Sequence, residues 1–167
     1  MDWDIRIGKG PKIPNGSALD KFFQRAKKNI TNIEKDFQVR SIGIDEESTG
    51  LILDFICKGL KIGTFSLPWV SDAEGYGETI TGTYIILTDY YGVPKMIVEI
   101  QNPFLTTFGD IGPDVTKLDG PPVQDINIWK PLHREYWNGL LLEYGKECTN
   151  DMPVIVEPFK LVYEEAN

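Results

Sequence analysis

Two runs of alternating residues with a turn between them constrain the fold of this chain more than any other feature. Residues 83–87 and 95–101 have strand spacing, and Asp89-Tyr90-Tyr91-Gly92 has the composition of a turn. The pattern predicts a β-hairpin. Helical patterns precede it, and a helix and a last strand follow it. The order predicts an α+β protein with a mostly antiparallel sheet and not a doubly wound fold.

Three helices are predicted from apolar residues at helical spacing and from their end signals. The first covers residues 18–34 after a cap at Ser17, and the second runs from Asp45 to a left-handed Gly59. The third covers residues 127–143. Further strands are predicted at 37–42, 61–67, 103–107 and 152–163, the last split by Pro158. Glycine and proline predict an irregular arm at 1–16 and loops at 68–82 and 108–124.

The length of 167 residues fits one compact domain with an extension. We expect residues 1–36 to form an arm and helix packed on a domain of residues 37–167. The net charge is −8, although the first 40 residues carry nine Lys or Arg against five Asp or Glu. General nucleic-acid binders are normally basic because they neutralise phosphates. The acidic balance therefore argues against non-specific coating of DNA or RNA.

The cysteine and histidine content excludes a common zinc site. Cys57 and Cys148 are far apart and His133 is the only histidine, so we expect no metal and no cofactor. Two reduced thiols fit a cytoplasmic protein, and one disulfide is the alternative. The sequence contains no apolar run of about 20 residues and begins without a hydrophobic signal core, so we expect neither membrane insertion nor export.

The stretch from Gly59 to Trp69 is the most informative candidate for chemistry. A helix ends at a glycine and a strand begins with Lys61. Alternation places the side chains of this strand on two faces. Lys61, Gly63 and Phe65 are expected on one face and Ile62, Thr64 and Ser66 on the other. A solvated lysine at the start of a strand is the simpler interpretation.

Two further features have a structural and a chemical interpretation. The loop acids Asp110, Asp114, Asp119 and Asp125 could supply a general base or hold a hard cation, or they are solvated acids with Asp125 as a helix cap. His133 follows Trp129 by one helical turn. It is either a packed, hydrogen-bonded side chain or a group that titrates near neutrality.

From about Val39 onward the chain resembles the ASCH domain family. The similarity lies in the helix end and strand around Lys61, in the hairpin, and in the last strand. The segments are Phe55 to Gly59, Lys61, Thr64, Ser66-Leu67, Trp69, Glu74-Gly75, 82–94, 129–137, Asp151 to Val154, Glu157 to Phe159, and Val162-Tyr163. The resemblance implies a PUA-like, small, mostly antiparallel β-barrel with flanking helices and a cleft beside the Gly-x-Lys strand.

The resemblance also implies candidate functions. PUA-like folds generally handle RNA or modified bases, and one small ASCH branch hydrolyses the amide of 4-acetylcytidine with a lysine, a threonine and an acid. The matching catalytic positions are Lys61, Thr64 and Asp119, although the family usually has Glu at the last. A lysine beside apolar walls could act as a base, and the hydroxyl could attack a carbonyl. Ser66, Trp69, Glu74, Phe65 and His133 are the expected substrate contacts.

Three alternatives to this amidohydrolase stay open at the level of sequence. One is a non-catalytic module that binds RNA or a nucleotide, with Phe65, Trp69 and Tyr76 as stacking surfaces. Another is a ribonuclease. The third is a homodimer in which the basic helix near the N-terminus meets the acidic remainder of a second copy. The expected partners are a nucleoside, a nucleotide or a short RNA, and neither DNA nor a membrane.

Overall fold

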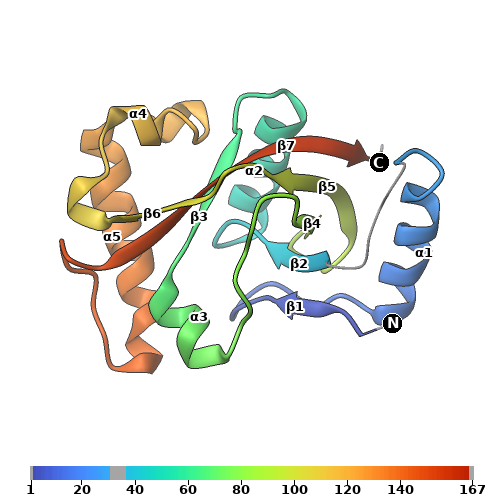
Figure 1. The fold of residues 1–167 in the computed structure, drawn as a ribbon, viewed down its shortest axis with the longest axis horizontal. Coiled ribbons are helices and arrows are strands. Elements are labelled where there is room, and N and C mark those ends of the chain that lie inside the picture. Colours follow the sequence, from blue (N-terminus) through green and yellow to red (C-terminus); the bar gives the residue numbers. More distant parts are fainter. Residues whose placement is uncertain (1, 31–36, 166–167) are drawn as a thin grey trace.

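The computed structural model describes residues 2–30 and 37–165 (Figure 1). It contains helices and strands from both halves of the chain. The elements are β1 (Asp4–Arg6), α1 (Gly16–Ala26), β2 (Phe37–Ser41), α2 (Glu46–Cys57), β3 (Gly63–Ser66), α3 (Pro68–Glu74), β4 (Tyr84–Thr88), β5 (Pro94–Ile100), β6 (Phe104–Thr107), α4 (Pro113–Thr116), α5 (Ile126–Leu141) and β7 (Pro153–Glu164).

Seven strands form one mixed sheet in the order β1-β2-β4-β5-β7-β3, and β6 also pairs with β7. The β1–β2 and β2–β4 pairs are parallel, and the other four pairs are antiparallel. The predicted hairpin is confirmed as β4 and β5. Figure 1 shows β7 (red) crossing the molecule between the side with α5 and the side with α1.

The predicted mixture of helices and strands is confirmed, but the closed barrel is wrong. A barrel needs a continuous ring of strand pairing. In the described part of the chain, β1 and β3 end the strand order and do not pair with each other. Side chains join the two sides of this opening, because Arg40 of β2 reaches Glu157 of β7. The opening holds the pocket described below.

Three apolar clusters hold the helices on the sheet. Leu19 and Phe22 of α1 pack on β2, β4 and β5. Leu53 and Ile56 of α2 pack on β4, β5 and β7. The third cluster surrounds Trp129 of α5 and includes residues of α4, of β7 and of the loops beside them. These clusters explain the helical spacing of apolar residues in the sequence, because each helix buries one stripe.

Several predicted boundaries are corrected by the structure. Asn15 caps α1 in place of Ser17, since its side-chain oxygen accepts from the Ser17 and Ala18 N–H groups. The helix α1 ends at Ala26, and residues 31–34 of the predicted helix lie outside the described residues. The caps at Asp45 and Asp125 are confirmed. The last strand is not split, because β7 continues through Pro158.

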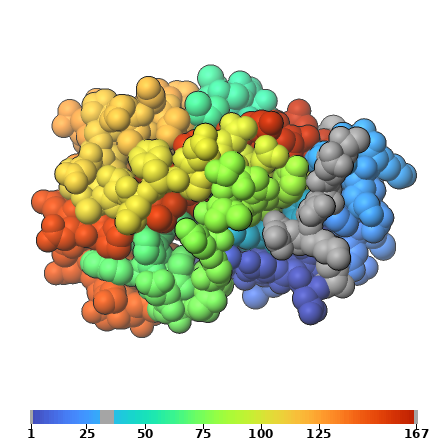
Figure 2. Space-filling model, viewed as in Figure 1, coloured from blue at the N-terminus to red at the C-terminus, as the bar shows by residue number. Residues whose placement is uncertain are grey.

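Short elements lie inside three segments that were predicted to be irregular. They are β1 in the arm 1–16, α3 in the loop 68–82 and α4 in the loop 108–124. The helix α3 has only seven residues, with Pro68 at its first position and Gly75 at its C-terminal end. Proline and glycine are common at these two positions of a helix, but in so short a segment they resemble the composition of a loop. Figure 2 shows that residues before β4 (light green) lie against the β5–β6 region (yellow). In this contact the Gly82 N–H donates to the Ile100 carbonyl at 2.9 Å.

Candidate functional site

Lys61 and Asp119 form an ion pair between the α2–β3 connection and the loop before α5. The helix α2 ends at Cys57 and has Lys58 as its C-cap, followed by Gly59 with a φ of 71°. The Lys61 N–H donates to the Phe55 carbonyl at 3.2 Å. This turn brings Lys61 toward Asp119. Lys61 Nζ lies 2.8 Å from Asp119 Oδ1, and the two side chains are 4% and 9% exposed. The interpretation of Lys61 as a solvated lysine is wrong.

Asp119 has hydrogen-bond donors on both carboxylate oxygens. The Gly120 N–H donates to Oδ1 at 2.8 Å, and the Trp129 Nε1–H donates to Oδ2 at 3.0 Å. Burial by itself would raise the pKa of Asp119, but the charge and hydrogen bond of Lys61 and the Gly120 N–H outweigh it and hold the pKa below its ordinary value. Gly120 is needed here because a Cβ would lie 2.8 Å from the Phe55 ring.

His133 completes this cluster from the next turn of α5. Its ring stacks on Trp129 with centroids 3.8 Å apart, and its Nδ1 lies 2.9 Å from the Trp129 carbonyl oxygen. A carbonyl only accepts, so Nδ1 carries the proton and Nε2 lies 3.7 Å from Asp119 Oδ2. Burial lowers the pKa of His133, although the Trp129 carbonyl and the Asp119 charge oppose this shift. The neutral imidazole therefore predominates at neutral pH.

Thr64 lies in a different environment from Lys61. In the β3–β7 register Thr64 is opposite Glu157, so the two side chains share a face of the sheet. Lys61, in contrast, contacts Asp119 and lies 5.9 Å from the centre of the Phe65 ring. The alternation in this strand fits these contacts. In the part of the chain that the structure describes, no hydrogen bond joins Lys61 to Thr64.

Glu157 belongs to a buried polar network that links β7 to β2. Its carboxylate accepts from Arg40 Nη1 at 2.8 Å and from Nη2 at 3.0 Å. The Glu157 side chain is fully buried and that of Arg40 is 11% exposed. Gln38 and Thr79 accept further hydrogen bonds from the same guanidinium. This network fixes Arg40 beside the opening between β1 and β3.

A pocket of about 170 Å³ lies at this opening. Its wall combines two arginines, three serines and several aromatic or aliphatic side chains. The lining residues are Arg6, Arg40, Ser41, Phe65, Ser66, Leu67, Val70, Ser71, Tyr76, Tyr136, Trp137 and Leu140. Ser41 Oγ is buried and has no hydrogen-bond partner in the described residues. The site therefore has a polar side toward β1 and β2 and an apolar side toward α5.

The structure separates the sequence-predicted site residues into three groups. Lys61, Asp119 and His133 come together, with Phe65 between this cluster and the pocket. Ser66 lines the pocket, and Thr64 lies beside Glu157. Trp69 and Glu74 make other contacts on α3. The Lys146 ammonium lies 5.1 Å from the Trp69 ring centre, and Tyr144 donates a hydrogen bond to Glu74.

Sequence reasoning missed Arg6, Arg40 and Glu157 as site residues. Glu157 has a local signal, because it is an acid inside the apolar run Val154 to Phe159. An acid in a buried strand requires a partner. The two arginines carry no comparable signal, since an arginine in a short strand is usually solvated. Only the tertiary structure brings them to the pocket.

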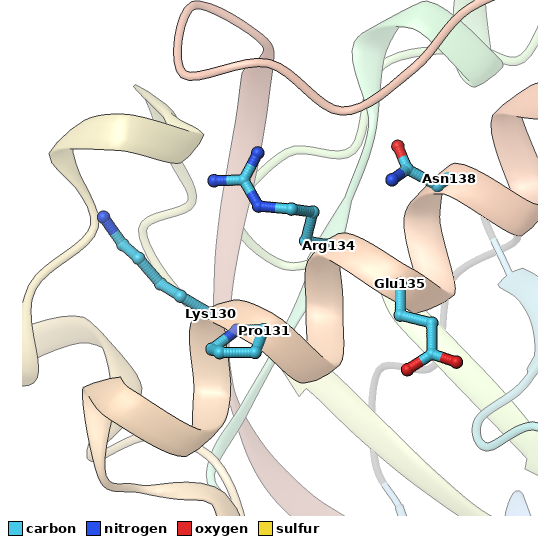
Figure 3. Close-up of a pocket in the computed structure, with 5 residues that line it drawn as sticks. All are labelled: Lys130, Pro131, Arg134, Glu135 and Asn138. Atoms are coloured by element: carbon cyan, nitrogen blue, oxygen red, sulfur yellow. The ribbon is translucent and has the colours of Figure 1, made fainter.

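A larger groove of about 440 Å³ lies along the outer side of α5 (Figure 3). It is lined by Lys130, Pro131, Arg134, Glu135 and Asn138. The Lys130 ammonium donates to the Gly109 carbonyl at 2.9 Å, and the Arg134 guanidinium lies 4.8 Å from the centre of the Phe108 ring. Its two cations are engaged by the protein, so the smaller pocket is the better candidate site.

Residues 2–30 and 37–165 contain neither a metal-binding cluster nor a membrane-spanning helix. No group of three or more His, Cys, Asp or Glu side chains there could hold a metal ion. No helix in these ranges is long and apolar enough to cross a membrane.

Residues 38–163 match the family model of the ASCH domain. The chain therefore belongs to the ASCH domain family. An ASCH domain from Lactobacillus crispatus JV V101 is similar in structure, with a TM-score of 0.81, 21% identity, and coverage of 93% of this chain and 98% of that chain. A protein from Enterococcus faecalis V583 has a TM-score of 0.74 and 17% identity over 87% of this chain and 88% of its own. No curated protein matches the sequence.

Proposed function

We propose that the pocket at the opening between β1 and β3 binds the base of a nucleoside, either free or at an accessible position of a short RNA. The observation that carries this proposal is the pocket itself, which combines hydrogen-bonding and aromatic side chains at the opening of the sheet. Such a combination is typical of small-molecule sites, where a few polar groups orient a ligand against apolar walls.

The pocket volume favours one ring over a larger ligand. Drug-sized ligands usually occupy about 300–1,000 Å³. A cavity of about 150 Å³ is enough to hold benzene. The pocket of about 170 Å³ therefore suits a six-membered ring, with an attached sugar left outside.

The walls and the charge of the protein agree with a base as the ligand. Phe65, Tyr76, Tyr136 and Trp137 supply aromatic surface in the pocket wall. Base–aromatic stacking contributes about 1–3 kcal/mol per base. The net charge of −8 opposes binding of a long polyanion, so a nucleoside or a short RNA is favoured over extended RNA.

Hydrolysis of 4-acetylcytidine is the second candidate, and Thr64 favours it. Its hydroxyl has no hydrogen-bond partner in the described residues, and it lies opposite the buried Glu157 and two residues before Ser66 of the pocket. A threonine oxygen could attack the acetyl carbonyl once a base removes its proton; the C–N bond then breaks, the amine of cytidine takes up the proton, and water hydrolyses the acetyl ester to release acetate and restore the threonine. Lys61 is held by Asp119 on the other side of β3, so the arrangement supports binding more directly than catalysis by Lys61, Thr64 and Asp119.

The binding test titrates the protein with cytidine, uridine and 4-acetylcytidine and follows tryptophan fluorescence, because Trp137 lines the pocket. Ser66→Leu adds atoms to the pocket and should weaken binding about ten-fold or more. Ser17→Leu adds the same atoms at the exposed start of α1 and should leave affinity unchanged. Equal affinity in both variants, or no binding of any nucleoside, would contradict the proposal.

The same samples test the second candidate. 4-Acetylcytidine is incubated with the wild type at high protein concentration, and loss of the acetyl group is followed by chromatography. Turnover that disappears in Thr64→Val would support hydrolysis, and Lys61→Ala tests whether the lysine contributes. Binding without turnover would leave the protein as a binding module.

A further inference from the structure

Arg6 and Arg40 are neighbours in the wall of the proposed binding pocket. They are register partners in the parallel β1–β2 pair, so their side chains lie on the same face of the sheet. Both line the pocket. Their side chains are 8% and 11% exposed, which is low for arginine. Two adjacent cations at this degree of burial require compensation.

Each arginine has its own carboxylate partner. Arg6 Nε donates to Asp4 Oδ1 at 3.1 Å and Arg6 Nη2 to Asp4 Oδ2 at 2.9 Å. Arg40 forms the bidentate pair with Glu157. The four side chains therefore sum to zero formal charge. The four side chains together therefore provide no net positive charge to attract an anion into the pocket.

Some N–H donors of these two arginines nevertheless have no hydrogen-bond partner in the described residues. An arginine carries five N–H donors. Arg6 also donates from Nη2 to the Gly77 carbonyl at 3.0 Å, which leaves both N–H groups of Nη1 without a partner in the described residues. Arg40 uses Nε and Nη2 on Gln38, Thr79 and Glu157, and one N–H of Nη1 on Glu157. One further N–H of its Nη1 has no partner there.

We propose that the Nη1 groups of Arg6 and Arg40 select a neutral ring that carries carbonyl oxygens, in preference to a phosphate or another anion. Three N–H donors that have no partner in the described residues belong to side chains that line a pocket of one-ring size, where acceptor atoms of a ligand would pair with them. The zero formal charge of the four side chains removes the advantage of a charged acceptor. This inference rests on the proposed function and adds the chemical class of the group that enters the pocket.

The test compares uridine, whose ring has two carbonyl oxygens, with inorganic phosphate, in low and high salt. We expect uridine affinity to change less than about two-fold with salt, because no net charge is neutralised. We expect phosphate not to compete. Arg6→Gln removes the Nη1 donors and should weaken uridine binding about ten-fold, whereas Arg25→Gln, outside the pocket, should have no effect. Thermal unfolding of each variant checks that the fold is intact.

A second variant tests the role of charge. Asp4→Asn leaves Arg6 without its carboxylate and should allow phosphate to compete with uridine, whereas Asp2→Asn changes the same charge at an exposed residue outside the pocket. Tight, salt-sensitive phosphate binding by the wild type would overturn the inference. Uridine binding that is unchanged in Arg6→Gln would overturn it while the proposed function stands. No binding of any nucleoside would overturn the proposed function itself.

Discussion

Arg40 and Glu157 form a bidentate ion pair between β2 and β7, although β4 and β5 separate these strands in the sheet. Three strand spacings of about 4.8 Å would place β2 and β7 about 14 Å apart in a flat sheet. Register pairing leads from Arg40 through Leu87 and Met96 to Glu164, which is seven residues from Glu157 along β7. Contacts of 2.8 and 3.0 Å between Arg40 and Glu157 therefore require a strongly curved sheet. The pair joins the two sides of the opening and fixes one wall of the pocket.

Breaking this pair on one side should be strongly destabilising. Arg40→Met leaves the buried Glu157 carboxylate without its cation, and Glu157→Gln removes the charge that Arg40 needs. Each change should lower the free energy of unfolding by about 3–5 kcal/mol. The Arg25–Glu165 pair is the matched control because it is also bidentate, at 2.7 and 2.8 Å, but its arginine side chain is 52% exposed.

The corresponding changes in the control pair should cost less than about 1 kcal/mol. Urea unfolding of the single and double variants gives both coupling energies. Equal coupling energies in the buried and the exposed pair would contradict the structural role assigned to Arg40 and Glu157.

Lys61→Met should reverse the sign of the pH dependence that Asp119 gives to the free energy of unfolding. In the wild type the pKa of Asp119 is lowered, so its contribution is present above the unfolded pKa and is lost as pH falls through the folded pKa. Without Lys61, burial raises this pKa above that of the unfolded chain. The variant should therefore be destabilised at neutral pH and should recover part of the loss as pH falls toward about 4.

The measurement is the free energy of unfolding between pH 4 and pH 7 for the wild type and for Lys61→Met. Lys58→Met is the control, because it breaks the exposed Lys58–Asp54 pair at the end of α2. That pair should contribute only about 0.3–0.5 kcal/mol. Parallel pH profiles for the wild type and Lys61→Met would argue against the buried pair.

His133 should titrate below the ordinary histidine pKa of 6.5, because burial disfavours the imidazolium. The unfolded chain then binds more protons than the folded chain between the two pKa values. The contribution of neutral His133 to the free energy of unfolding should be fully present above pH 6.5 and should decrease as the pH falls from 6.5 to the pKa of the folded protein. His133 is the only histidine, so one NMR titration of its ring protons measures the pKa directly.

A measured pKa above 6.5 would contradict this prediction. Asp119→Asn provides a second readout, because the Asp119 charge raises the pKa of His133. Removing that charge should lower the pKa further.

Cys57 should react slowly with alkylating reagents although it is an exposed residue. Partial burial of the thiol, a hydrogen bond with Glu164 and the charges of Glu164 and Asp54 raise the pKa of Cys57 to about 11 from 9.0. The thiolate is the reactive form, so a rise of this size should slow alkylation at neutral pH by about 100-fold relative to a thiol of ordinary pKa.

The measurement uses Cys148→Ser, which leaves Cys57 as the only thiol. Iodoacetamide labelling is followed by mass spectrometry. Glu164→Gln should increase the rate, because it removes one of the causes of the raised pKa. Labelling as fast as a free cysteine would refute the prediction.

Much of the fold was predictable because it depends on local patterns. The hairpin of β4 and β5, the caps at Asp45 and Asp125, and the helix α5 follow from residue spacing and from side chains that satisfy nearby backbone groups. The short elements β1 and α3 were missed. Three and seven residues give too short a pattern. These elements contact distant parts of the chain, because β1 pairs with β2 and α3 packs on the cluster around Trp129.

The candidate site was predictable only in part. The ASCH resemblance led to Lys61 and Asp119, and the structure brings them together in a buried pair. The sequence contains no signal that Arg6 is adjacent to Arg40, or that Arg40 reaches Glu157, because these residues are far apart in the chain.

The sequence by itself therefore determined the helices, the hairpin, the acidic character and the family. The tertiary structure decided that the sheet stays open and that the pocket at its opening has two arginines whose charges are neutralised. The physical reason is the range of the interactions. Spacing and capping act within a few residues, whereas burial and ion pairing depend on which distant groups the curved sheet brings within hydrogen-bond distance.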